Sequence, residues 1–153
     1  RVVRVFPAGD LFATGVADQF GDAVTVWNAT IGEMVAEVRR PDWVTLLEVS
    51  PCGKKLVVTG GSWAFIWDAA SWQLESMHCT FQGDVTGLAI SAGGERVFAS
   101  SAGGSAHIFT EGGSRRHMVR MEEAVLGIAG FPDGVRFLAF GAQTAVVWDA
   151  RTR

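Results

Sequence analysis

The chain has 153 residues, of which 48% are hydrophobic and 19% are charged, a composition that indicates a globular protein and excludes a disordered one. No segment approaches the run of about eighteen apolar residues that a membrane-spanning helix requires, so no membrane partner is expected. The formal net charge of −3 lacks the positive excess of nucleic-acid-binding proteins, which disfavours nucleic acid as a partner.

A turn that closes on glycine recurs four times along the chain. The four turns are Phe6-Pro-Ala-Gly9, Ser50-Pro-Cys-Gly53, Ser91-Ala-Gly-Gly94 and Phe131-Pro-Asp-Gly134. Proline presets the φ angle of the second turn residue, and glycine accepts the positive φ that completes the turn. Apolar segments lead into these turns and predict strands, at Val3 and Val5 and at 44–49, 85–90 and 125–131. Each turn therefore predicts the first hairpin of a sheet.

A second, a third and a fourth strand are predicted after these turns. The second strands cover 11–14, 56–59, 97–100 and 135–138, and the third strands cover 23–28, 64–68, 106–110 and 145–149. Each third strand carries an aromatic residue near its end, and these residues lie 40, 42 and 39 residues apart. More polar segments at 33–37, 72–75 and 114–117 predict fourth strands. This gradient fits sheets whose first strand is buried and whose last strand faces solvent.

A repeat of this length that ends in Trp-Asp or Trp-Asn resembles the WD40 repeat family over essentially the whole chain. The repeat residues that carry the resemblance are Trp27, Trp67, Phe109 and Trp148, with Asp68 and Asp149 directly after two of them. The resemblance implies an all-β fold, a β-propeller with about four blades of four antiparallel strands each. The blades would lie at about 1–40, 41–79, 80–121 and 122–153, the first and last incomplete, and would form one partial propeller over 1–153.

The chain also departs from the family pattern. The Gly-His dipeptide before the first strand is absent, and Gly83-Asp84 is the nearest equivalent. Where the family places an aspartate before the third strand, this chain has Gly103-Gly104 and Ala142-Gln143. We therefore expect that the Asp-His-Ser/Thr-Trp hydrogen-bond network of the family does not form, and that apolar packing alone holds the blades together.

The number of blades leaves three arrangements open. A ring of seven blades requires roughly 280–315 residues, so these blades either belong to a larger ring, complete a ring with a second chain, or close as a four-bladed ring. We favour the larger ring, because Arg1 falls within a predicted strand. The expected partners are therefore other proteins, or the remaining blades of the same protein.

No pattern of catalytic residues is visible. His78, His107 and His117 fall at different positions of their repeats, so they are not expected to converge on a metal ion. Ser100 and Ser101 lack the Gly-x-Ser-x-Gly elbow that exposes the nucleophile of a serine hydrolase.

The remaining reactive residues also favour structural roles. Glu122 and Glu123 are neighbouring carboxylates in a predicted loop, where solvation is the expected state. Cys52 and Cys79 lack the spacing of metal ligands, and we expect two reduced thiols in an intracellular protein of the cytoplasm or nucleus. We therefore expect no enzymatic activity, no metal and no cofactor.

The family resemblance implies a docking face. In WD40 propellers, the loops between blades and the turns between second and third strands gather at one face, where partners usually bind. Four residues at the starts of first strands would lie there and are predicted to contact a partner: Trp43, Thr45, Asp84 and Thr86. An aromatic residue beside polar neighbours is a common hot-spot composition. Packing of Trp43 between two blades is an equally good interpretation.

The hairpin between the second and third strands of the first repeat is about four residues longer than its counterparts. The extra residues fall within 16–22, and Asp18, Gln19 and Phe20 are predicted to form an exposed recognition loop on the same face. A tolerated insertion, with Phe20 packed onto its blade, is the slightly favoured alternative.

The function expected from the sequence is that of a non-enzymatic scaffold, which presents a propeller face for protein–protein interaction within a larger protein or assembly. Two alternatives remain open. The blades could be purely structural parts of a tandem propeller, or the propeller could bind a small ligand or an enzyme substrate in its central channel. The residue pattern does not identify the partner, because one fold serves unrelated functions.

Overall fold

The computed structural model describes residues 1–18, 21–40, 44–79, 82–110 and 115–151. The described residues form antiparallel sheets, and no helix is present among them. The strands of the first two sheets are β1 (Val2–Val5), β2 (Leu11–Asp18), β3 (Gly21–Asn28) and β4 (Met34–Arg40), then β5 (Leu46–Val49), β6 (Lys55–Gly60), β7 (Trp63–Asp68) and β8 (Leu74–Cys79). The strands of the other two sheets are β9 (Val85–Ile90), β10 (Arg96–Ser101), β11 (Ser105–Thr110) and β12 (Arg115–Arg120), then β13 (Gly127–Gly130), β14 (Arg136–Phe140) and β15 (Ala145–Asp149).

Each sheet orders its strands as the chain does, so neighbouring strands are joined by hairpins. The second strand begins two residues after the turn glycine in every sheet, which sets a common register. The aromatic residue of each third strand pairs with the same position of the second strand: Phe12 with Trp27, Leu56 with Trp67, Val97 with Phe109, and Phe137 with Trp148. The predicted fourfold repeat of strands is therefore confirmed, whereas the fourth strands begin one or two residues later than predicted.

The glycine turns form as predicted. The amide of each closing glycine donates to the carbonyl of the first turn residue, over 2.8 to 3.0 Å. The φ angles of Gly9, Gly53, Gly94 and Gly134 are 76°, 73°, 84° and 66°. These values lie in the left-handed region that glycine enters without steric cost. The turn thus fixes where each second strand starts.

A second turn, built on the residue after the aromatic, leads out of three of the third strands. The side-chain Oδ1 of Asn28 accepts from the amides of Thr30 and Ile31 at 2.9 and 3.1 Å. Asp68 does the same with Ala70 and Ser71 at 3.1 and 2.7 Å. Such side-chain turns reverse the chain.

In the fourth sheet, Asp149 accepts from the amide of Arg151 at 2.8 Å and forms an ion pair with its guanidinium. These bonds from Arg151 lower the pKa of the Asp149 carboxyl to about 2. The Asp of the Trp-Asp pair is therefore a turn residue in both places.

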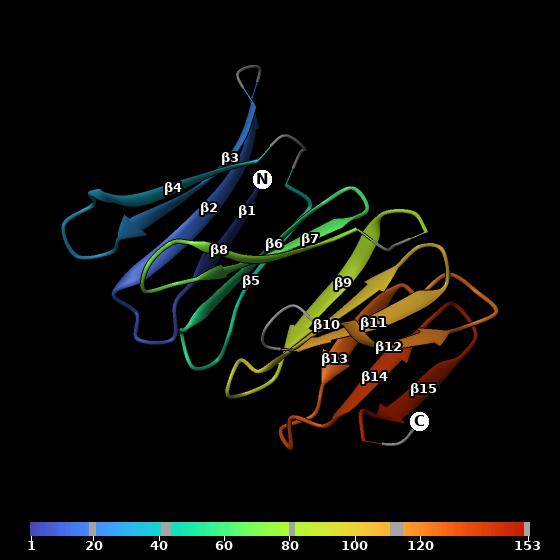
Figure 1. Ribbon diagram of the computed structural model, residues 1–153. Helices are drawn as coiled ribbons and strands as arrows, with labels where there is room; N and C mark the ends of the chain where they lie inside the picture. Colours follow the sequence, from blue (N-terminus) through green and yellow to red (C-terminus); the bar gives the residue numbers. More distant parts are fainter. Residues whose placement is uncertain (19–20, 41–43, 80–81, 111–114, 152–153) are drawn as a thin grey trace.

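The four sheets lie side by side and meet through their first strands, with contacts from β1 to β5, from β5 to β9 and from β9 to β13. Figure 1 shows the sheets following one another in chain order, from the blue strands to the red ones. An apolar cluster fills each gap between successive sheets. Successive antiparallel sheets in this order are compatible with the blades of a propeller.

The two middle sheets bury both of their faces. Leu56 and Val58 of β6 pack toward the first sheet, whereas Val57 between them packs toward the third. Because side chains alternate across a strand, a sheet between two others needs apolar residues at successive positions. All six residues of β6 are buried, and the three apolar residues 56–58 at its centre meet this need.

Aromatic rings strengthen these interfaces. His78 of β8 stacks on Phe109 of the third sheet, with ring centroids 4.0 Å apart. Phe137 of the fourth sheet stacks on Phe98 of the third at 5.1 Å and on Trp148 of its own sheet at 5.6 Å. Offset ring pairs add to the energy of area burial. Burial among these groups lowers the pKa of His78.

Polar bonds also hold the sheets, so the expectation of apolar packing alone is wrong. The indole Nε1 of Trp27 donates to Thr14 Oγ1 at 3.0 Å. In the third sheet, where phenylalanine replaces tryptophan, Ser105 Oγ lies 2.8 Å from Ser101 Oγ and 2.9 Å from His107 Nε2. Hydroxyls of short side chains thus form hydrogen bonds within the first and third sheets.

Much of the long hairpin of the first sheet is paired strand. Ala17 pairs with Asp22 and Asp18 with Gly21, so residues 16–18 and 21–22 lengthen β2 and β3. Gln19 and Phe20 lie outside the described residues, so the recognition loop proposed for Asp18, Gln19 and Phe20 stays a prediction.

We predict that Phe137→Ala destabilises the chain by about 3–5 kcal/mol, because it removes a fully buried ring that joins the third and fourth sheets. Urea denaturation followed by circular dichroism measures the change. The control is Val3→Ala, whose side chain is 55% exposed, and which is expected to change stability by less than about 0.5 kcal/mol. If Phe137→Ala lowers the free energy of unfolding by no more than Val3→Ala does, the result would contradict the described interface.

Candidate functional site

One end of the array, here called the loop face, combines the connections between sheets with the turns between second and third strands. Its described residues are 44–45, 61–62, 82–84, 102–104, 121–126 and 141–144. The amide of Val85 donates to Gly61 O at 3.0 Å, and the amide of Ala102 donates to Asp84 O at 3.0 Å. The amide of Met121 likewise donates to Gly104 O at 2.8 Å, so backbone bonds hold these connections to turns.

The two glycines in the third sheet's turn permit this close approach. A Cβ atom at Gly103 would lie 1.8 Å from the carbonyl oxygen of Gln82. Gly104 has a φ of 80°, and a Cβ there would lie 2.8 Å from Met121 O. The Gly-Gly pair that the sequence marks as a turn therefore also makes room for two connecting segments.

Glu123 anchors the fourth sheet's turn. Its carboxylate accepts from the amides of Ala142 at 3.0 Å and Thr144 at 2.8 Å, from the amide of Gln143, and from the Thr144 hydroxyl. The Thr144 hydroxyl bond, followed by the amide bonds, lowers the pKa of the Glu123 carboxyl. The expectation that both carboxylates of the Glu122–Glu123 pair are merely solvated is wrong for Glu123.

This arrangement reverses the one in the family pattern. There, an aspartate in the turn meets a histidine in the connecting loop, whereas here the loop supplies the carboxylate and the turn supplies backbone amides. The sequence signal was available: the turn Ala142-Gln143-Thr144 lacks a carboxylate of its own, and a glutamate stands just before the first strand. Backbone amides are good partners for a carboxylate, because the bonds are charge-assisted.

The predicted partner residues Thr45 and Thr86 lie on or beside the loop face, but their hydroxyls bond within the sheets. Thr45 Oγ1 lies 2.9 Å from Thr59 Oγ1. Thr86 Oγ1 lies 3.1 Å from Ser100 Oγ and donates to Val125 O at 2.5 Å. These hydroxyls brace the starts of the first strands and are already engaged.

The other predicted partner residues have different outcomes. Asp84 is exposed on the loop face. The bond with Ala102 described above uses the backbone carbonyl of Asp84 and not its side chain. Trp43, Gln19 and Phe20 lie outside the described residues. Asp18 belongs to β2, and its side chain is also outside the description.

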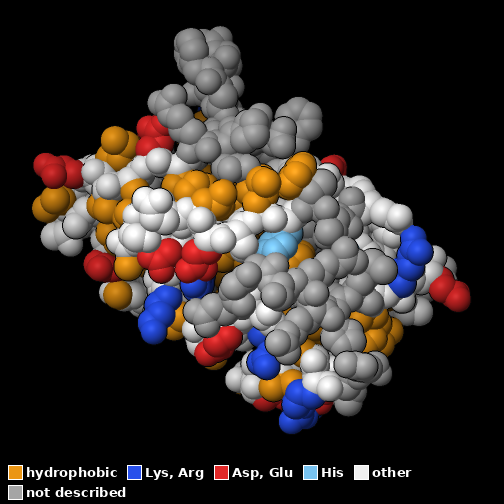
Figure 2. Space-filling view, viewed as in Figure 1, with side chains coloured by type: hydrophobic (Ala, Val, Ile, Leu, Met, Phe, Trp, Pro, Cys, Tyr) orange, Lys and Arg blue, Asp and Glu red, His pale blue; other side chains and the backbone are white. Residues whose placement is uncertain are grey.

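The loop face also exposes residues that were not among the predicted partner residues. Glu122 is exposed, and Leu126 is 52% exposed although it is a large apolar residue. Arg120 donates to Gln82 Oε1 at 2.7 Å and links two connecting segments. Figure 2 shows hydrophobic side chains gathered over the middle of its view, between charged side chains of both signs. The described surface thus mixes apolar and charged groups.

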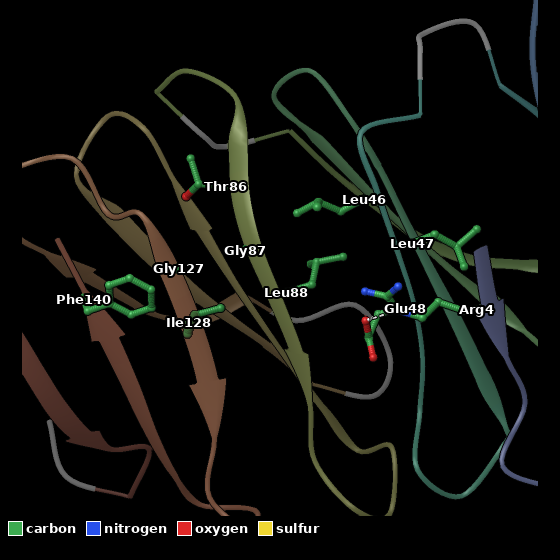
Figure 3. Close-up of a pocket in the computed structure, with 10 residues that line it drawn as sticks. All are labelled: Arg4, Leu46, Leu47, Glu48, Thr86, Gly87, Leu88, Gly127, Ile128 and Phe140. Carbon is green, nitrogen blue, oxygen red and sulfur yellow. Dashed lines mark hydrogen bonds and ion pairs between the residues drawn. The ribbon is translucent and has the colours of Figure 1, made fainter. Parts of the chain in front are cut away.

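A groove, here called the inner-strand groove, runs along the first strands and has a volume of about 270 Å³. It is shown in Figure 3, and the residues that line it are Arg4, Leu46, Leu47, Glu48, Thr86, Gly87, Leu88, Gly127, Ile128 and Phe140. A Cβ at Gly87 would lie 2.9 Å from the amide nitrogen of Ile128. The backbones of β9 and β13 therefore approach each other directly beside the groove.

One ion pair supplies the charges in the groove. Arg4 Nε lies 2.8 Å from Glu48 Oε2, and Figure 3 shows the two side chains facing each other. Glu48 lies on β5, within the segment 44–49 that the sequence predicts as a first strand. Its partner Arg4 was missed, because charge pairing across 44 residues of sequence is not visible in a local pattern.

No cluster of potential metal ligands occurs among the residues that the structure describes. Cys52 is exposed, and its thiol donates to Gly93 O at 3.2 Å, across the gap between the second and third sheets. No helix in the described ranges is long and apolar enough to cross a membrane.

Compared with protein-family models and with curated proteins, the chain matches none at a significant level. Its repeat pattern and its geometry are therefore the basis for a functional assignment. The geometry offers a braced face with exposed mixed side chains, and a small groove with one ion pair. Both are suited to binding.

We predict that Glu123→Ala lowers the melting temperature at neutral pH, because three turn amides lose their acceptor. The carboxylate has a lower pKa in the folded chain than in the unfolded chain. It therefore stabilises the fold above the unfolded value of about 4.3, and this contribution is lost as the pH falls through the folded value. Melting curves of both proteins from pH 7 to pH 3 check this, and a difference that stays constant over the range would contradict it.

Proposed function

We propose that the chain forms consecutive blades of a WD40-type β-propeller and acts as a non-enzymatic scaffold for protein–protein interaction. The assignment to this family rests on the aromatic repeat, on the glycine turns and on the order of strands in the four sheets. Because radial sheets hold their loops at fixed angles, such an array loses little entropy when it binds.

The observation that carries the docking role is the loop face. Its connecting segments are bonded to neighbouring turns, by backbone bonds and by the Glu123 carboxylate. On this braced frame, Asp84, Glu122 and Leu126 are exposed. A rigid frame with exposed apolar and charged side chains is the composition of a docking surface.

We predict that Asp84→Arg weakens partner binding at least about tenfold, because it inverts a charge at the proposed contact. A photo-crosslinking residue at position 126 is used to capture partners from a lysate of the source cells. Excess original chain without the crosslinker should compete for the partners and reduce the amount of crosslinked product. Excess Asp84→Arg chain should not reduce it. Thermal melts check that the variant is folded.

A second crosslinker, at Ile31, is the control. Ile31 is 64% exposed and lies in the turn after β3. That turn is at the far end of the strands, where the amide of Ala29 bonds to Asp10 O at 2.7 Å. If positions 31 and 126 give the same products, or if Asp84→Arg competes as well as the original chain, the loop face is not the docking surface.

A ligand in the inner-strand groove is the second candidate function, favoured by the cavity itself. Its volume of about 270 Å³ is at the small end of ligand pockets. Screening small molecules by thermal shift with the original chain and with Glu48→Gln would test it. A hit that raises the melting temperature of both proteins equally would argue against binding beside the Arg4–Glu48 pair.

A further inference from the structure

A larger cavity, here called the β15 pocket, lies between the end of the third sheet and the fourth sheet. Its volume is about 490 Å³. One wall is the connecting segment 120–123, and the other is formed by residues 143–144 and by β15. The pocket therefore opens at the loop face but extends below it along the third strand of the fourth sheet.

The wall on β15 is aromatic and apolar. Trp148 lines the pocket and is partly buried, and its ring stacks on Phe137 at an interplanar angle of 24°. Val146, two residues earlier on the same side of the strand, is 37% exposed. Because Phe137 is fully buried, the indole is held in one orientation as part of the pocket wall.

The opposite wall carries a carboxylate that is not committed to the fold. The Glu123 carboxylate is occupied by the turn 142–144. Glu122 is exposed and lines the pocket, and no hydrogen bond joins its side chain to another described residue. The cationic group of Arg120 also lines the pocket, and it donates to Gln82 Oε1. The pocket thus combines an indole with one available carboxylate.

We propose that the β15 pocket binds the guanidinium group of an arginine side chain from a partner protein. The inference rests on the proposed docking function and names the chemistry of the partner. A planar guanidinium stacks on an indole and also bonds to a carboxylate. An apolar side chain would leave the Glu122 carboxylate desolvated without a partner, and a lysine ammonium would pair with it but would not stack in the same way.

The test uses three short peptides that differ only at the central residue: acetyl-Gly-Arg-Gly-amide and the same peptide with citrulline or lysine. Citrulline keeps the planar shape of arginine but has no charge. Titration into the isotopically labelled chain is followed through the indole N–H signal of Trp148, assigned with the Trp148→Phe variant. The arginine peptide is expected to shift this signal at concentrations roughly three- to tenfold lower than either other peptide.

Two variants test the separate contributions of the Glu122 and Arg120 charges to binding, and both leave the turn contacts of Glu123 in place. Glu122→Gln should weaken binding of the arginine peptide by roughly three- to tenfold, which is the range for one partly exposed charge pair. Arg120→Gln should strengthen binding, because it removes a positive charge from the pocket. Equal binding of arginine and citrulline, equal binding of arginine and lysine, or an unchanged affinity in Glu122→Gln would each overturn the proposal.

The peptide titration and the crosslinking experiment together distinguish a failure of the pocket assignment from a failure of the proposed docking function. If the arginine peptide does not bind while Asp84→Arg still abolishes competition for crosslinked partners, the loop face docks partners and the pocket assignment is wrong. If the peptide binds as expected but crosslinking at position 126 gives no competed product, the pocket recognises guanidinium and the wider docking surface is wrong.

Discussion

The structure depends on the apolar contact between successive sheets. Each interior sheet must bury both of its faces, so its second and third strands need buried side chains at successive positions rather than at alternate ones. The strand β6 is the clearest case, since all six of its residues are buried. The repeat aromatics Trp67, Phe109 and Trp148 all pack toward the preceding sheet. The aromatic repeat in the sequence therefore reflects the packing of each sheet on the one before it.

Because packing fixes the positions of the sheets relative to one another, the connections between them gather at one end of the array and form the loop face. The glycines at 103 and 104 admit the neighbouring segment, and Glu123 anchors the turn 142–144. The residues that brace this surface and the residues that it exposes are therefore different sets. Thr45 and Thr86 belong to the first set, and Asp84 and Glu122 to the second. Position in the repeat therefore did not separate exposed side chains from bonded ones.

The contribution of buried polar groups to the stability of the sheets was not predicted correctly from the sequence. The absence of the family's aspartate suggested packing without a hydrogen-bond network, yet Trp27 bonds to Thr14, and Ser101, Ser105 and His107 form a buried group. Short hydroxyl residues are common in strands, so their presence alone carries no signal. Their bonds arise only when the register places two of them on the same side of a pair of strands.

The sequence alone determined the number of sheets, the positions of the turns and the register of the aromatic positions, because these follow from local rules: the period of two along a strand, the φ of glycine and the spacing of the repeat. The tertiary structure decided the Arg4–Glu48 pair, the role of Glu123 and the β15 pocket. The Arg4–Glu48 pair and the pocket join residues from different sheets, and Glu123 reaches a turn about twenty residues along the chain. Only the folded arrangement of the strands brings such residues together.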